Sequence, residues 1–115
     1  MVEQYLDKLK FIDLEHSINL MRTPDFSGVP RLEKLCLRGC INLVEIHPSI
    51  GQLSKLNVLD LQSCKSLTNL PSMTSKMESL TILNLSGCSK IKNRKGLHYS
   101  RHARKIGKRF AVSQI

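Results

Sequence analysis

Leucine and isoleucine recur along the chain in a fixed pattern that alternates with polar residues. The stretches "LKFIDLEHS", "LEKLCLRGC", "LNVLDLQSC" and "LTILNLSGC" all follow the spacing L-x-x-L/I-x-L-x-x-C/S. They begin at residues 9, 32, 56 and 80, so the pattern returns after 23, 24 and 24 residues. The alternation in the middle of each stretch predicts a short strand, because successive side chains of a strand point to opposite sides.

The period indicates how these strands assemble. Both the spacing and the period match a leucine-rich repeat, in which one unit spans about 20 to 29 residues. We expect one strand per repeat, stacked in parallel on the next at about 4.8 Å, with the leucines facing a common interior. The predicted fold is an α/β repeat: a short leucine-rich-repeat solenoid with one parallel β-ribbon on the concave face and irregular or 3-10 returns on the convex side.

The ninth position of each stretch lies where the chain leaves the strand and turns inward. It must hold a small side chain that tolerates burial and can donate a hydrogen bond to a neighbouring carbonyl, and cysteine meets both conditions. We therefore interpret this position as a structural ladder, made of Ser17, Cys40, Cys64 and Cys88.

Further residues expected to point inward follow the ladder in each of the first three repeats, and a proline closes the segment. The prolines exclude regular helix and strand just beyond them, which favours an irregular return. The residues that we expect to point inward there are Leu20, Leu43 and Leu67, then Thr23, Ile46 and Leu70, and finally Val29, Leu53 and Met77.

The repeat register ends near residue 93. At the positions of the earlier inward residue and proline stand Arg94 and Lys95, so the fourth repeat stops after its strand. We divide the chain into a repeat array over residues 1–93, with repeats at about 9–31, 32–55, 56–79 and a partial one at 80–93, and a basic tail over residues 94–115.

Charge separates the two parts of the chain. Residues 1–78 hold 9 Lys/Arg and 9 Asp/Glu, whereas residues 79–115 hold 9 Lys/Arg and no acid. Three interpretations of the tail stay open: a disordered cationic segment, a helix that covers the edge of the last strand, and a segment for nucleic acid, acidic surfaces or nuclear import. The helix would carry an apolar stripe at Tyr99, Ala103, Ile106 and Phe110. The basic side chains around that stripe are Arg101, Arg104, Lys105, Lys108 and Arg109.

Composition argues against several function classes. No apolar run reaches the length of a signal peptide core or a membrane span, so we expect a soluble cytoplasmic protein with free thiols, with nuclear entry through the basic tail as an alternative. No phosphate-binding glycine loop and no histidine-activated Ser or Cys signature occurs. Only Cys36 and Cys40 have a zinc-like spacing, and we predict their side chains on different faces. We expect no enzyme activity, no cofactor, no metal and no bound nucleotide.

Longer stretches carry a more specific resemblance. "LKFIDLEHSINLMRTPDFSGVPRLEKLCLRGCINLVEIHPSIGQLSKL" and "LPSMTSKMESLTILNLSGCSKIKN" closely resemble the leucine-rich-repeat region of plant disease resistance proteins of the TIR-type nucleotide-binding leucine-rich-repeat class. The similarity covers about Leu6 to Asn93 and rests most on "TPDFSGVP" and "NLVEIHPSIG". The resemblance implies a protein partner for this chain: a pathogen effector, a host protein or a related immune receptor. The chain has neither a TIR nor a nucleotide-binding domain, so the resemblance implies a truncated member.

We therefore expect a protein-interaction module of the plant defence type. The outward strand positions are the candidates for partner binding: Phe11, Asp13, Glu15, Lys34, Cys36, Arg38, Val58, Asp60, Gln62, Ile82 and Asn84. Two alternatives stay open: a cationic nucleic-acid-associated protein that acts through its tail, and a truncated fragment without function.

Overall fold

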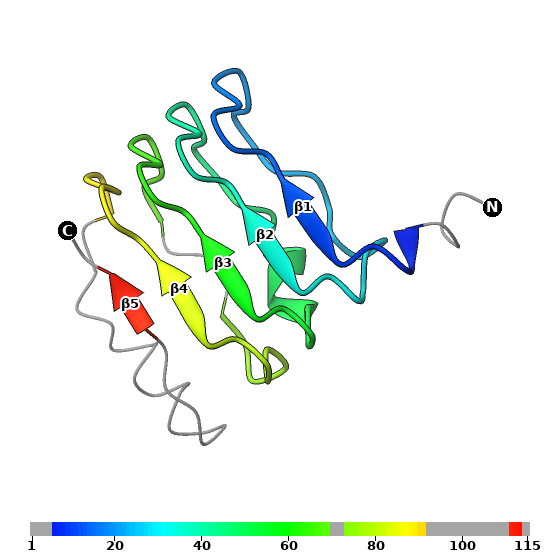
Figure 1. The fold of residues 1–115 in the computed structure, drawn as a ribbon. Helices are drawn as coiled ribbons and strands as arrows, with labels where there is room; N and C mark the ends of the chain where they lie inside the picture. The colour runs from blue at the N-terminus through cyan, green and yellow to red at the C-terminus, as the bar shows by residue number, and fades with distance from the viewer. Residues whose placement is uncertain (1–5, 70–72, 92–110, 114–115) are drawn as a thin grey trace.

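A parallel β-sheet organises the chain (Figure 1). The structure, a computed structural model, describes residues 6–69, 73–91 and 111–113. The strands are adjacent in the order in which they occur along the chain, and each pairs in parallel with the next. Their bounds are β1 Phe11–Asp13, β2 Lys34–Cys36, β3 Val58–Asp60, β4 Ile82–Asn84 and β5 Ala111–Ser113.

The strand register follows the leucine spacing. The central residues Ile12, Leu35, Leu59 and Leu83 are paired across neighbouring strands, as are the residues on either side of them. Because equivalent residues of each stretch lie side by side, the sequence interval of 23 or 24 residues becomes one step across the sheet. The four strands predicted from the alternating pattern are confirmed.

The interior is built from the repeated leucines. Leu35, Leu59 and Leu83 are fully buried, and so are the residues that begin each stretch, Leu32, Leu56 and Leu80. Burying one such side chain contributes on the order of 2 kcal/mol, so the stacked leucines are the main source of stability. Ile12 is only half-buried, because β1 is an edge strand.

The returns between strands add a second layer to this interior. Val29, Leu53 and Met77 are buried as expected, and Phe26 fills the first return. Thr23 is also buried, and its hydroxyl accepts a hydrogen bond from the backbone N–H of His47 at 2.8 Å. Leu70 lies outside the described residues.

One return contains a short 3-10 helix, η1, over Pro48–Gln52. Proline fits the start of a helix because its fixed φ suits the first turn and its missing N–H would have no partner there. The His47 ring accepts the N–H of Ser49 at 3.0 Å and so caps this start. The return is thus irregular with one 3-10 turn, the type of connection that the prolines indicate.

A tight turn follows each of the first four strands. Its first residue accepts a hydrogen bond from the N–H of the ladder residue three positions on, as Leu37 does from Cys40 at 3.2 Å. The third turn residue has a positive φ, the feature of a type II turn. These third residues are His16 at 60°, Gly39 at 72°, Ser63 at 62° and Gly87 at 75°.

The fifth strand extends the sheet beyond the predicted repeats. Ala111–Ser113 pairs with β4, with Leu83 opposite Val112. The leucine pattern ends near residue 93 and therefore did not predict this strand, which lies in the segment assigned to a basic tail. A strand edge offers unpaired N–H and C=O groups to any extended segment, so the pairing depends little on side chains.

The described architecture is a small parallel sheet with little helix, consistent with an α/β class. Within the described ranges, no helix has the length and apolar character needed to cross a membrane.

Candidate functional site

The outward side chains of β1 to β4, together with those of the turns that follow these strands, form one surface, here called the strand face. Pairing places the predicted binding residues in columns that cross the sheet. The first column is Phe11, Lys34, Val58 and Ile82, the second is Asp13, Cys36, Asp60 and Asn84, and the turn column is Glu15, Arg38, Gln62 and Ser86. The structure therefore brings the predicted strand-face residues together.

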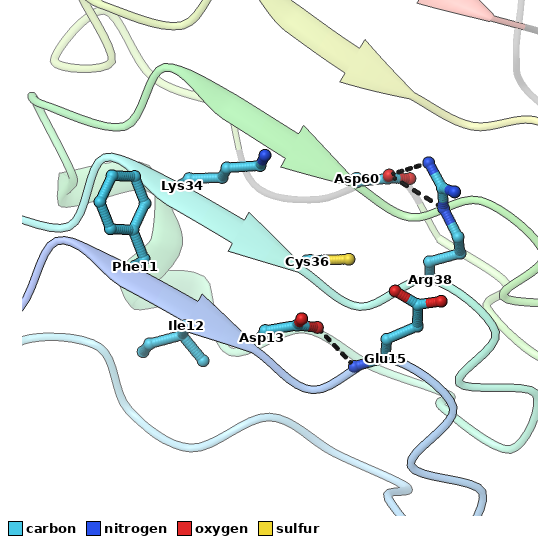
Figure 2. A pocket seen from close by; sticks show the side chains of 8 residues that line it. All are labelled: Phe11, Ile12, Asp13, Glu15, Lys34, Cys36, Arg38 and Asp60. Carbon is cyan, nitrogen blue, oxygen red and sulfur yellow. Dashed lines mark hydrogen bonds and ion pairs between the residues drawn. The ribbon is translucent and has the colours of Figure 1, made fainter.

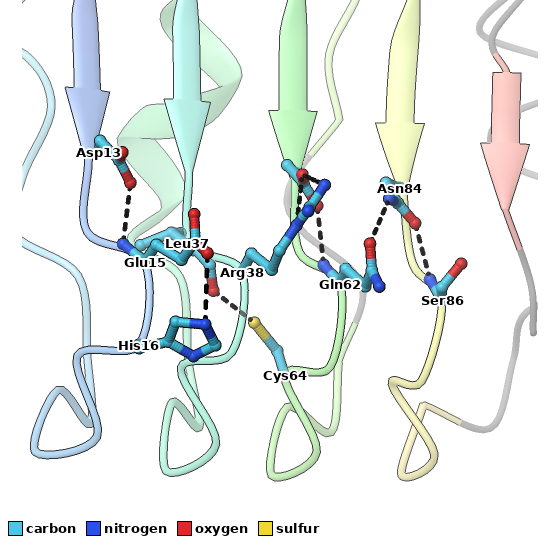
Figure 3. A network of polar contacts seen from close by, with 10 residues as sticks. Asp13, Glu15, His16, Leu37, Arg38, Gln62, Cys64, Asn84 and Ser86 are labelled. Atoms are coloured by element: carbon cyan, nitrogen blue, oxygen red, sulfur yellow. Dashed lines mark hydrogen bonds and ion pairs between the residues drawn. The ribbon is translucent and has the colours of Figure 1, made fainter.

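The second column also has a role in the fold. The side-chain Oδ1 atoms of Asp13, Asp60 and Asn84 each accept the backbone N–H of the residue two positions later, all at 3.0 Å. Figure 3 shows the bonds of Asp13 and Asn84. This local bond lets Asp and Asn open the turn that follows the strand. The signal was present in the sequence, since Asp or Asn stands at this position in three of the four stretches.

One charged pair crosses the strand face between two repeats. Arg38 donates to Asp60 Oδ2 through Nε at 3.2 Å and through an NH2 group at 2.8 Å. The hydrogen bond to Asp60 raises the pKa of Arg38. Asp60 points outward as expected, yet it is only 8% exposed because Arg38 lies over it. At this place on the strand face a partner would therefore contact Arg38 rather than Asp60.

A cavity of about 380 Å³ lies on the strand face over β1, β2 and β3. Figure 2 shows Phe11 and Lys34 at one end and Glu15 with the Arg38–Asp60 pair at the other. The remaining lining residues are Ile12, Asp13 and Cys36. The hollow depends on side chains from three repeats, so the spacing within one repeat did not indicate it.

The donors in this cavity can hold a cation. One ligand atom each from Asp13, Glu15 and Cys36 lies within 4.8 Å of the others. Burial raises the pKa of Cys36, so the sulfur stays a thiol near neutral pH and is a weak nucleophile and a weak metal ligand. The arrangement is suited to binding through charge and hydrogen bonds rather than to covalent chemistry.

The ladder cysteines lie on the interior side of the sheet, away from this cavity. Cys40, Cys64 and Cys88 are fully buried, and each thiol donates to a carbonyl of the preceding repeat. The acceptors are Leu14 at 3.2 Å, Leu37 at 3.1 Å and Leu61 at 2.9 Å. The hydrogen bond with Cys88 and burial raise the pKa of Cys64, and burial raises that of Cys40. These thiols are donors that join repeats.

An exposed apolar strip was missed by the search for strand-face residues. Ile18 and Met21 follow the first ladder position, and Ile41 and Val44 follow the second. The two segments are in contact, since the Val44 N–H donates to the Met21 carbonyl at 2.8 Å. The signal was an apolar residue directly after the ladder position and another three residues later.

The basic side chains assigned to the tail, Arg101, Arg104, Lys105, Lys108 and Arg109, lie outside the described residues.

Comparison with known proteins identifies relatives for part of the chain. No family model matches it. Over 50 residues, or 44% of the chain, it is 50% identical to Disease resistance protein RPV1 and 51% identical to Disease resistance protein RUN1, both of Vitis rotundifolia. Over 52 residues, or 45% of the chain, it is 50% identical to TMV resistance protein N of Nicotiana glutinosa. The matched segment spans about 4% of the length of each of these relatives. The resemblance to a short region of plant disease resistance proteins is confirmed.

Proposed function

We propose that this chain, similar over nearly half its length to a short region of plant disease resistance proteins, is a non-enzymatic protein-interaction module of the defence response. In this proposal the parallel sheet is a short leucine-rich-repeat solenoid with the strand face on its concave side. The partner is a protein: a pathogen effector, a host protein or a related immune receptor. The module acts in the cytoplasm without a cofactor.

The observation that carries the proposal is the difference in burial between the two sides of the strands. The inward leucines are buried, while the strand face keeps charged side chains exposed beside the apolar Phe11 and Ile82, which are 63% and 42% exposed. A cavity with apolar and charged lining is a favourable place for a partner side chain. A role in binding accounts for this mixture, whereas the stacking of strands needs only the inward residues.

The test is a selection of plant leaf protein fragments, displayed on phage, against the full chain. Fragments that bind are then titrated against two strand-face variants, Lys34→Glu and Val58→Glu, and two matched variants outside the face, Lys76→Glu and Thr68→Glu. We expect affinity to fall roughly tenfold for the strand-face pair only, because Val58→Glu places an unpaired charge in the interface and Lys34→Glu reverses the charge that the face presents to the partner. Equal affinity for all four variants would contradict the proposal.

A second candidate function rests on the charge of residues 79–115, which hold 9 basic residues and no acid. A segment of this kind can bind nucleic acid through phosphate contacts. Such binding would weaken steeply with salt and would be lost when Arg101, Arg104 and Lys105 are changed to Gln. Retention on a nucleic-acid column at two salt concentrations separates this function from strand-face binding, which needs none of these residues.

A further inference from the structure

The cavity on the strand face has charge that the fold leaves unbalanced. Arg38 and Asp60 neutralise each other through their two hydrogen bonds, and the second carboxylate oxygen of Asp60 accepts the N–H of Gln62 at 3.0 Å. The charges of this pair therefore largely cancel, although Arg38 keeps N–H donors that its two bonds to Asp60 do not use. The charge available to a ligand comes from Asp13, Glu15 and Lys34.

Two carboxylates define the anionic end of the cavity. Among the described residues, neither Asp13 nor Glu15 has a salt bridge to Lys or Arg, and both are exposed. Glu15 lies 3.2 Å from the His16 ring, which is charged only when protonated. The one turn bond that Asp13 accepts uses only Oδ1. Both carboxylates can therefore accept hydrogen bonds from a cationic ligand.

The spacing of the acceptor atoms suits an ammonium group. Such a group carries three N–H donors at tetrahedral angles, so acceptors about 2.8 Å from the nitrogen lie about 4.6 Å apart. The ligand atoms of Asp13, Glu15 and Cys36 are all within 4.8 Å of one another. The lysine side chain of a partner could thus contact both carboxylates and the thiol at once.

The other end of the cavity offers an apolar contact. The Phe11 ring is 63% exposed and stands two residues before Asp13 on β1. Residues two apart in a strand are about 6.6 Å apart and face the same side, and an extended peptide has the same spacing. Lys34 lies beside Phe11 (Figure 2), so its charge would repel a second cation there. The chemistry favours a single lysine over a polybasic run.

We propose that this cavity binds an extended segment of a protein partner in which one lysine stands two positions from an apolar residue. The ammonium contacts Asp13 and Glu15, and the apolar side chain packs on Phe11. The inference rests on the proposed function, because it specifies the partner of the same face.

The test is an NMR titration of the ¹⁵N-labelled full chain with acetyl-Gly-Leu-Ser-Lys-Gly-amide. A matched peptide has norleucine in place of lysine, and a third has leucine and lysine adjacent. We expect the lysine peptide to shift the amide signals of residues 11, 13, 15 and 36 and to bind roughly fivefold more tightly than either control peptide, as for an ion pair at a partly exposed site.

Charge-neutral variants test the carboxylates directly. Asp13→Asn keeps the turn acceptor, since Asn84 makes the same bond in β4, and Glu15→Gln keeps the shape of the side chain. Each is expected to weaken binding of the lysine peptide roughly threefold to fivefold. Glu45→Gln, which neutralises an exposed acid paired with Arg22 outside the cavity, is expected to leave affinity unchanged.

Three results would overturn the inference. Equal affinity for the lysine and norleucine peptides would rule out the ammonium contact. The proposed function would be unaffected, because it is tested separately with the displayed fragments. The absence of shifts at the cavity at millimolar peptide would reject this occupant, again without deciding the proposed function. Shifts of the same amides by zinc chloride alone, lost in Cys36→Ser, would assign the donors to a metal instead.

Discussion

The inner and outer sides of the same strands differ in how far their residues vary between repeats. The inner positions of β2 to β4 hold leucine throughout, and the ladder holds cysteine in each of these repeats. The outer column of Phe11, Lys34, Val58 and Ile82 mixes an aromatic, a charged and two aliphatic side chains. Stacking imposes the same environment on each inner position, whereas the outer positions meet solvent or a partner. The inner residues of each strand therefore stabilise the stack, and the proposed function assigns binding to the outer residues that alternate with them.

The contrast between the inner and outer sides predicts that two neighbouring residues of β3 contribute very differently to the free energy of unfolding. Leu59→Ala should lower the free energy of unfolding by about 2 to 5 kcal/mol, because it leaves a cavity in the stacked core. Val58→Ala, one residue earlier and facing outward, should lower it by about 1 kcal/mol or less. Urea unfolding followed by far-UV circular dichroism measures both. Similar losses for the two variants would show that the sides of the strand are not specialised.

The ladder should contribute less than the leucines. Cys64→Ala removes the donor to the Leu37 carbonyl and some buried volume, so we expect a loss of about 1 to 2 kcal/mol in the free energy of unfolding. The matched change Cys36→Ala, on the strand face, should have a smaller effect. A loss at position 64 no larger than at position 36 would argue against the ladder as a link between repeats.

The same thiol predicts a pH dependence. The pKa of Cys64 is raised above its ordinary value of 9.0, so the folded state keeps a proton that the unfolded state releases. Its contribution to stability is complete below about pH 9 and declines as the pH rises above that value, by at most about 1.4 kcal/mol per pH unit. Unfolding titrations at several pH values should give a shallower decline for Cys64→Ala than for the wild type. Parallel curves for the two proteins would count against a buried protonated thiol.

The smallest expected effect on stability concerns the turns that follow the strands. Ser63 has a φ of 62°, a conformation that costs non-glycine residues about 1 kcal/mol, so Ser63→Gly should raise stability by about that amount. Gly39→Ala should act in the opposite direction, because Gly39 has a φ of 72° and a Cβ there would meet the His16 ring. Thermal melts of the two variants provide the measurement. A destabilised Ser63→Gly protein would mean that the serine side chain is needed for more than the turn.

The sequence predicted most of the fold because the informative signal is local. Leu35, Leu59 and Leu83 are each flanked by polar or variable residues at a spacing that only a strand can place on one side. A fixed repeat then determines which residues pair, since each repeat contacts its neighbours in the same way. The strand β5 escaped prediction because its pairing relies on backbone groups of an exposed edge and not on leucine spacing.

The candidate site was predicted only as a set of outward positions. Their columns followed from the register, but the pattern gave no reason to single out the end of the face near Phe11. Asp60 illustrates the limit, since its position was predicted as outward while its burial results from a side chain 22 residues away in the sequence.

The sequence by itself thus determined the strand positions, the parallel register, the inward leucines and the placement of the thiols, because these depend on the spacing of residues along one segment. Only the tertiary structure decided the Arg38–Asp60 pair and the cavity over three strands. These features arise where side chains and carbonyl groups of different repeats meet. Their geometry depends on contacts between segments more than 20 residues apart, which no local pattern records.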